Sequence, residues 1–169
     1  GLGDKEPGRR AKIMGGLRDA LRQKSIGVIE DDPEKKIVKY GKPAGVIASL
    51  IPVTCAYVTP ATVAIYAVKC KDAVIFSPHP ASKRTTAEVV RIMRAALKAA
   101  GAPEDILQCA EKPSMPLAQE LMSICDLTIA TGGPAMVKAA YSSGKPAYGV
   151  GPGNVPVYLH SSADPARAV

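Results

Sequence analysis

The stretch at residues 131–154, TGGPAMVKAAYSSGKPAYGVGPGN, decides the fold of this chain. It begins with the pair Gly132 and Gly133, continues into a helical run, and ends with an apolar strand followed by a second Gly-x-Gly. The residues before it, 126–130 (DLTIA), have the apolar character of a buried strand. A strand, a glycine turn and a helix in this order suit a nucleotide ligand.

The turn at residues 131–134 (TGGP) has two interpretations. Pro134 fits the first helical position, and the free N–H groups of that turn, at the positive end of the helix dipole, could hold an anion such as a pyrophosphate. The alternative is a plain strand-to-helix connection that uses glycine for its backbone freedom. TGGP is not the GxGxxG fingerprint, so the turn alone does not decide between them.

Length and composition indicate one domain with an aliphatic core. The chain has 169 residues, 47% of them hydrophobic, with no Trp and one Phe. No apolar run reaches the roughly 18 residues of a membrane span. There is also no pattern of a signal peptide, so a cytoplasmic protein is the default expectation.

Cysteine spacing and charge disfavour several classes of function. The four cysteines form no CxxC pair and only two histidines are present, so we expect reduced thiols and no metal site. The formal charge of +7 is spread along the chain, and we expect no nucleic-acid partner. A phosphorylated ligand would use the same charge, although a solvated surface explains most of it.

The first 42 residues are expected to form an arm and residues 43–169 a nucleotide-binding domain. Within the arm, Ile13, Leu17 and Leu21 predict one apolar stripe of a helix over residues 9–24. Residues 28–40 read as a hairpin around an Asp-Asp-Pro turn.

From residue 44 onward, strands and helices alternate. Expected strands cover residues 45–51, 73–76, 106–110, 126–130 and 146–150. Helices are expected over residues 59–71, 85–100, 116–123 and 136–142. This order predicts an α/β fold: a doubly wound, mainly parallel, five-stranded Rossmann-like sheet with helices on both faces.

The helix expected over residues 85–100 is the clearest. Its predicted apolar face is Val89, Ile92, Met93, Ala96, Leu97 and Ala100. Thr85 and Glu88 form a possible capping box at its start, and Gly101 with Pro103 marks its end.

Ligands of such sheets bind beyond the carboxyl ends of the strands. Three of these ends carry unusual residues: 52–56 (PVTCA), 77–80 (SPHP) and 131–134 (TGGP). These three segments are the candidate site.

Three segments together make the chain resemble the aldehyde dehydrogenase superfamily, in its CoA-acylating branch of acetaldehyde, propanal and sulfoacetaldehyde dehydrogenases. They are IFSPHP at 75–80, ATGGPAMVKAAYSSGKPA at 130–147 and GVGPGNVPV at 149–157. The resemblance runs from about Arg9 onward, and residues 17–33 and 37–46 look closest to the sulfoacetaldehyde type.

The resemblance implies a site for NAD or NADP. The cofactor-binding residues that it implies are Val53, Thr54, Ser77, Pro78, His79, Pro80, Thr131, Gly132, Gly133 and Pro134. Pro80 replaces a glutamate that grips the ribose hydroxyls in hydrolytic relatives, and Lys83 and Arg84 follow, so NADP would be tolerated beside NAD. His79 could also simply cap its turn.

The resemblance also implies a loop on the substrate side, with Gly151, Gly153 and Asn154. Val150 stands where hydrolytic relatives keep a glutamate that activates water. Without that base, attack by the thiol of CoA on the acyl-enzyme is favoured over hydrolysis.

Two departures qualify the resemblance. Cys55 and Ala56 replace the family's Asn-Pro, whose asparagine donates to the oxyanion, and a thiol is a poor donor. The family's nucleophilic cysteine comes from a segment beyond Val169, and none of Cys70, Cys109 and Cys125 lies in its motif. Each of these three is expected to be a small buried hydrophobe.

The expectation is therefore the NAD(P)-binding part of an oxidoreductase that converts an aldehyde and CoA to an acyl-CoA. It would be inactive alone and part of a homo-oligomer in the full-length enzyme. The alternative is a non-catalytic nucleotide-binding or interaction module derived from the same fold. His160 is expected on the surface, and Lys138 and Tyr141 are expected to pack or face solvent.

Overall fold

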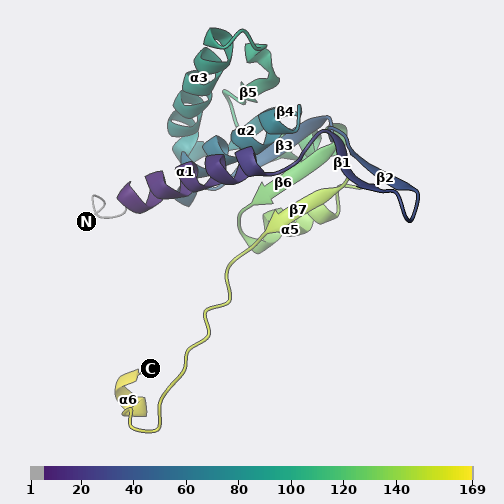
Figure 1. The fold of residues 1–169 in the computed structure, drawn as a ribbon. Coiled ribbons are helices and arrows are strands. Elements are labelled where there is room, and N and C mark those ends of the chain that lie inside the picture. Colours follow the sequence, from purple (N-terminus) through teal and green to yellow (C-terminus); the bar gives the residue numbers. More distant parts are fainter. Residues whose placement is uncertain (1–5, 169) are drawn as a thin grey trace.

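A five-stranded parallel sheet forms the centre of the computed structural model, which describes residues 6–168. Its order is β5-β4-β3-β6-β7 (Figure 1), so the chain builds outward from β3 in one direction and then in the other. The strands are β3 (Val46–Ile51), β4 (Ala73–Pro78), β5 (Leu107–Cys109), β6 (Leu127–Thr131) and β7 (Ala147–Val150). The predicted doubly wound α/β fold is confirmed.

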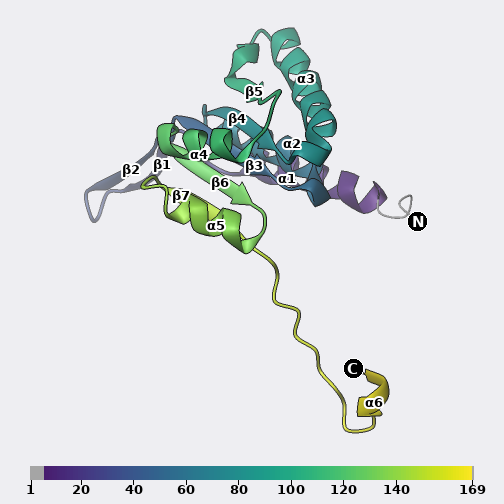
Figure 2. The same cartoon turned by 180° about the vertical axis from the view of Figure 1, so that it is seen from behind.

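Helices cover both faces of the sheet. On one face, α2 (Val58–Lys69) and α3 (Lys83–Ala99) bury Ile47 and Ile51 of β3. On the other face, α4 (Met115–Ile124) and α5 (Pro134–Tyr141) bury Leu50 of β3. Figure 2, in which the molecule is turned by 180°, shows these two helices in front of the sheet. Side chains alternate between the faces because successive residues of a strand point in opposite directions.

The core is built around β3, whose continuous apolar run at residues 45–51 predicted a buried parallel strand. All residues of β3 after Val46 are buried, which is typical of a central parallel strand covered on both sides. Phe76 of β4 supplies the aromatic side chain of this core and is fully buried, a contribution of roughly 1.5–3 kcal/mol.

The first helix, α1 (Glu6–Arg22), packs across α2. Its contact is made by Gly16 and Ala20, and Asp19 accepts a 2.8 Å hydrogen bond from the Tyr66 hydroxyl. The predicted helix is confirmed, but its predicted stripe is wrong at Leu21, which is 71% exposed. The small residues let the two helices approach closely, and the stripe rule looks only for large apolar ones.

The hairpin predicted after α1 is confirmed. Strands β1 (Gly27–Asp32) and β2 (Ile37–Gly41) pair antiparallel and project away from the main sheet (Figure 1). The division into an arm over residues 1–42 and a domain over residues 43–169 stays a prediction.

The start of α3 differs from the prediction. A short 3-10 helix, Pro80–Ser82, leads directly into α3, so Thr85 lies inside the helix. Glu88 does not complete a capping box and instead forms a 2.7 Å ion pair with Arg91. The end is confirmed, since Gly101 has the left-handed φ of +74° that terminates helices.

The apolar face of α3 is also rotated from the predicted one. Thr86 and Val90 are its buried residues, whereas Ile92 is 54% exposed. The apolar pattern did not predict that Thr86 is buried, because threonine carries a polar hydroxyl.

A glycine joins the arm to the sheet at its amino edge. Gly45 has a φ of +116°, its N–H donates to Asp72 Oδ1 at 2.9 Å, and the N–H of Val46 donates to Asp126 Oδ2 at 2.8 Å. A Cβ at residue 45 would collide with the Asp126 carboxylate. The turn therefore requires glycine for both conformation and space.

We predict that Gly45→Ala lowers the free energy of unfolding by about 2–4 kcal/mol, because it combines a strained φ with the loss of the Asp126 hydrogen bond. Urea denaturation measures this change. Gly15→Ala in α1 is the matched control, since a Cβ there meets nothing within 4 Å. It should raise stability by about 0.5–1 kcal/mol. Equal stability of the two variants would contradict this account of the turn.

Candidate functional site

A cleft of about 410 Å³ lies at the carboxyl edge of the sheet, where the strand order reverses between β3 and β6. Open α/β sheets bind ligands at this point, because the loops of the two strands diverge there. The loops that follow β3, β4 and β6 form its walls.

The cleft brings together most of the predicted site residues. Those that line it are Val53, Thr54, Ser77, Pro78, His79, Pro80, Thr131 and Gly132. Gly133 and Pro134 follow immediately at the start of α5 and are not part of the lining. Three segments that are far apart in the sequence thus share one cavity.

Sequence analysis missed the wall contributed by α4 and α5. Ser114, Met115 and Ala118 come from the start of α4, and Met136 comes from α5. The signal for α4 was the position of Ser114 after β5, because the carboxyl end of every parallel strand meets the same edge. Ser114 caps α4 by accepting the Leu117 N–H at 3.3 Å.

The glycine pair is not explained by its backbone conformation. Gly133 has an ordinary extended conformation (φ −71°, ψ 168°), and Gly132 is not among the residues of positive φ. A Cβ at Gly133 would meet nothing within 4 Å. The chain bends at Gly132 as expected, but the bend uses no backbone conformation that is reserved for glycine. Gly133 leaves open space in front of the start of α5, where Pro134 is the first residue as predicted.

His79 caps the turn in which it lies. Its Nδ1 accepts the Ala81 N–H at 3.2 Å, and its own backbone N–H donates to the Ile51 carbonyl at 3.0 Å. The capping alternative is thus confirmed. Because Nδ1 is an acceptor, the neutral ring carries its proton on Nε2, where it can donate.

The loop after β3 holds Cys55 outside the lining of the cleft. Val53–Cys55 form a 3-10 helix, and Cys55 is exposed. The next residue, Ala56, is buried, and its carbonyl accepts a 2.8 Å hydrogen bond from the hydroxyl of Thr86. The oxyanion role of Cys55 stays a prediction.

The other three thiols are less exposed than Cys55. The prediction that all three are buried is confirmed for Cys125, whereas Cys70 and Cys109 are half-buried. Burial raises the pKa of Cys109 to about 11. It is also the main cause that raises the pKa of Cys70 and of Cys125, which is fully packed between β3 and α4.

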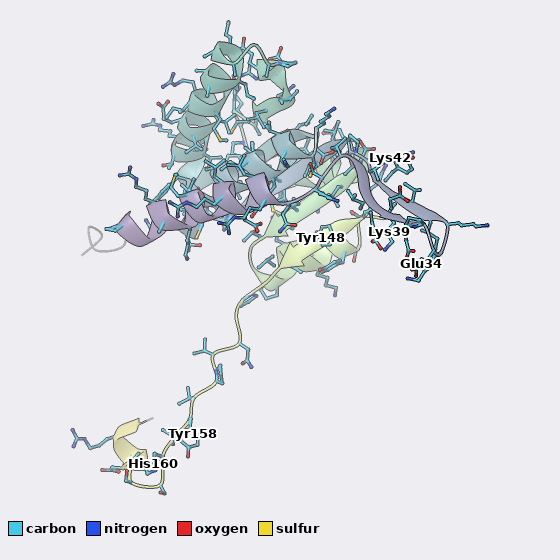
Figure 3. All side chains as sticks on the ribbon, viewed as in Figure 1. Glu34, Lys39, Lys42, Tyr148, Tyr158 and His160 are labelled. Atoms are coloured by element: carbon cyan, nitrogen blue, oxygen red, sulfur yellow. The ribbon has the colours of Figure 1, made fainter. Side chains whose placement is uncertain are left out.

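The predicted substrate-side loop lies beyond β7. Gly151, Gly153 and Asn154 belong to an exposed extended segment outside the lining of the cleft. Figure 3 shows Tyr158 and His160 at the far end of this segment, away from the sheet. The short helix α6 (Pro165–Ala168) follows them.

Tyr141 stabilises the edge strand that leads to this segment. Its hydroxyl accepts the Gly149 N–H at 3.0 Å. A Cβ at Gly149 would lie 2.6 Å from Val137 Cγ1 and 2.9 Å from the Tyr141 ring. Glycine there allows α5 to approach β7, so Tyr141 has the packing role that we expected.

Membrane-spanning helices and metal-ligand groups are both absent from residues 6–168. No helix in this part of the chain is long and apolar enough to cross a membrane. The same residues contain no group of three or more His, Cys, Asp or Glu side chains suited to a metal ion. Fold and cleft together define a Rossmann-like α/β domain with a cleft at the reversal of strand order.

Comparison with known proteins identifies homologues of this chain. No family model matches the chain. It is 52% identical to a sulfoacetaldehyde dehydrogenase of Acholeplasma sp. over 151 residues, which are 89% of this chain and 31% of the relative. Its homologues are acylating aldehyde dehydrogenases, and the chain spans 31% to 34% of the length of three of them. It spans 17% of the length of the aldehyde-alcohol dehydrogenases that it also matches.

Solved structures agree. A crystal structure of an acetylating aldehyde dehydrogenase from Geobacillus thermoglucosidasius is 44% identical with a TM-score of 0.84, over 95% of this chain and 36% of that one. An engineered glycolyl-CoA reductase with bound NADP⁺ is 37% identical with a TM-score of 0.65, over 67% of this chain and 26% of that one.

We predict that iodoacetamide at pH 8 modifies Cys55 first. Cys55 is exposed, whereas the pKa of about 11 leaves Cys109 protonated at this pH. Mass spectrometry of proteolytic peptides measures the four rates, and Cys55→Ala should remove the fast phase. Faster labelling of Cys109 than of Cys55 would contradict the burial seen here.

Proposed function

We propose that the cleft binds the nicotinamide nucleotide of a CoA-acylating aldehyde dehydrogenase. The observation that carries the proposal is the convergence of Val53, Ser77 and Thr131, each at the end of a different strand, on one cavity at the reversal of strand order. Ser77 and Thr131 belong to two of the segments on which the family resemblance depends. The NADP⁺ bound to a structural relative supports the same ligand class.

The residues of the cleft suit the parts of such a ligand differently. Met115 and Met136 offer apolar surface to a planar base. The open space at Gly133, at the positive end of the α5 dipole, suits a phosphate group. His79 can donate through Nε2 to a ribose hydroxyl.

In the whole enzyme we propose oxidation of an aldehyde to an acyl-CoA. When bound, NAD or NADP supplies the hydride acceptor. This chain would hold it and shape one wall of the reaction site, with Cys55 at the oxyanion position. Since a thiol is a weak donor, the loss of an amide there costs on the order of 3 kcal/mol of transition-state stabilisation.

We predict that Gly133→Val abolishes binding of NAD and NADP while the chain stays folded. The side chain fits the free protein, because no atom lies within 4 Å of a Cβ at this position, so it would occupy only the space of the ligand. Titration calorimetry measures affinity and circular dichroism checks the fold.

Gly15→Val is the matched control for Gly133→Val, since a Cβ at Gly15 in α1 also meets nothing within 4 Å. It should bind as the parent does. Unchanged affinity in a folded Gly133→Val variant would remove the start of α5 from the proposed site.

The finer proposal is that NADP is accepted beside NAD. No carboxylate occurs in the turn after β4, where Pro80 lies, and the exposed cations Lys83 and Arg84 follow at the start of α3. A carboxylate at this strand end would repel a 2′-phosphate, whereas nearby cations attract it.

We predict that the double variant Lys83→Ala, Arg84→Ala weakens NADP⁺ binding about 10-fold and leaves NAD⁺ binding within about twofold, because only NADP carries the 2′-phosphate. Lys98→Ala is the control, since Lys98 lies near the other end of α3 and pairs with Glu104 at 3.2 Å. Equal losses for both nucleotides would argue against 2′-phosphate recognition here.

A further inference from the structure

A buried hydroxyl links α3 to the loop that follows β3. Thr86 lies on the face of α3 toward the core with no solvent exposure, and its Oγ1 donates to the Ala56 carbonyl at 2.8 Å. Thirty positions separate the two residues, so the bond joins two parts of the chain that only the fold brings together. Ala56 is the residue directly after the 3-10 helix Val53–Cys55, which carries part of the cleft wall.

The segment that leads into α3 belongs to the β4 loop, which forms the neighbouring wall of the cleft. Ser82, just before α3, donates from its hydroxyl to the His79 carbonyl at 3.3 Å, and its N–H donates to that carbonyl at 2.9 Å. These two bonds hold the β4 loop together where it runs directly into α3. The start of α3 is therefore joined to the β4 loop through the chain and to the β3 loop through the Thr86 hydrogen bond. The β4 loop is held by a backbone hydrogen bond, from the Ser82 N–H to the His79 carbonyl. In the β3 loop, the Ala56 carbonyl is held by a side chain, that of Thr86.

We propose that Thr86 is a positioning residue for the proposed nucleotide site: its hydroxyl fixes residues 53–57 at the spacing from the β4 loop that the ligand requires. The inference rests on the proposed function for the identity of the ligand. Thr86 itself does not line the cleft, so it acts through the loop.

Thr128 shows why burial alone does not give Thr86 this role. It is as completely buried, in β6, but its Oγ1 has no hydrogen-bond partner among residues 6–168. A buried hydroxyl without a partner contributes nothing that valine would not replace, whereas loss of the Thr86 hydroxyl leaves a buried carbonyl unpaired.

The test compares Thr86→Val, Thr86→Ser and Thr128→Val in the full chain by amide hydrogen exchange and by calorimetry with NADP⁺. In Thr86→Val, exchange of residues 53–57 should become about 10-fold faster and NADP⁺ binding about 10-fold weaker, the change expected for one lost buried hydrogen bond. Thr86→Ser keeps the donor and should restore both to within about twofold. Thr128→Val should change neither.

Other outcomes decide against the proposal. Exchange that accelerates equally in β4 and β6 would mean that Thr86 only stabilises the fold, and an unchanged loop would mean that the bond does not hold it. Thr86→Ala, which also removes the donor to the Ala56 carbonyl, replaces Thr86→Val if the latter does not fold, with the same expectation. A parent chain that binds no nucleotide contradicts the proposed function, while the exchange of residues 53–57 still decides whether Thr86 holds the loop.

Discussion

The rest of the structure depends on the burial of β3 from both sides. Its residues after Val46 are buried, because α2 and α3 cover one face of the sheet and α4 and α5 cover the other. A parallel strand in this position needs neighbours on both edges, so the chain adds β4 on one side and β6 on the other. The cleft is the consequence, because the loops of β3 and β6 leave the sheet toward opposite faces.

Two positions in or beside the wall of the cleft, Gly133 and Pro80, matter because they carry no bulky or acidic side chain. Gly133 leaves space before α5 although its backbone conformation does not require glycine, and Pro80 adds no charge to the turn after β4. Contacts behind the wall then hold these surfaces in place. The Thr86 hydroxyl on Ala56 and the Nδ1 of His79 on the Ala81 N–H are two such contacts.

Particular elements show how far the sequence could be interpreted. The five strands were predicted within a few residues, because continuous apolar runs between turn residues leave little choice. The capping box at Thr85 and Glu88 was wrong because a 3-10 turn begins the helix earlier and Arg91 takes the carboxylate. The stripe in α1 was wrong because Gly16 and Ala20 make the contact, and small residues carry no periodic apolar signal.

By itself, the sequence determined the alternation of strands and helices, the three loops at the carboxyl edge and the resemblance to acylating aldehyde dehydrogenases. These follow from local patterns and short motifs. Only the tertiary structure decided that Met115 and Met136 complete the cleft, that Gly133 has an ordinary extended conformation with open space around it, and that Thr86 bonds to Ala56. Such features depend on distances between segments remote in the chain, which are set by the packing of helices on the sheet rather than by any local sequence preference.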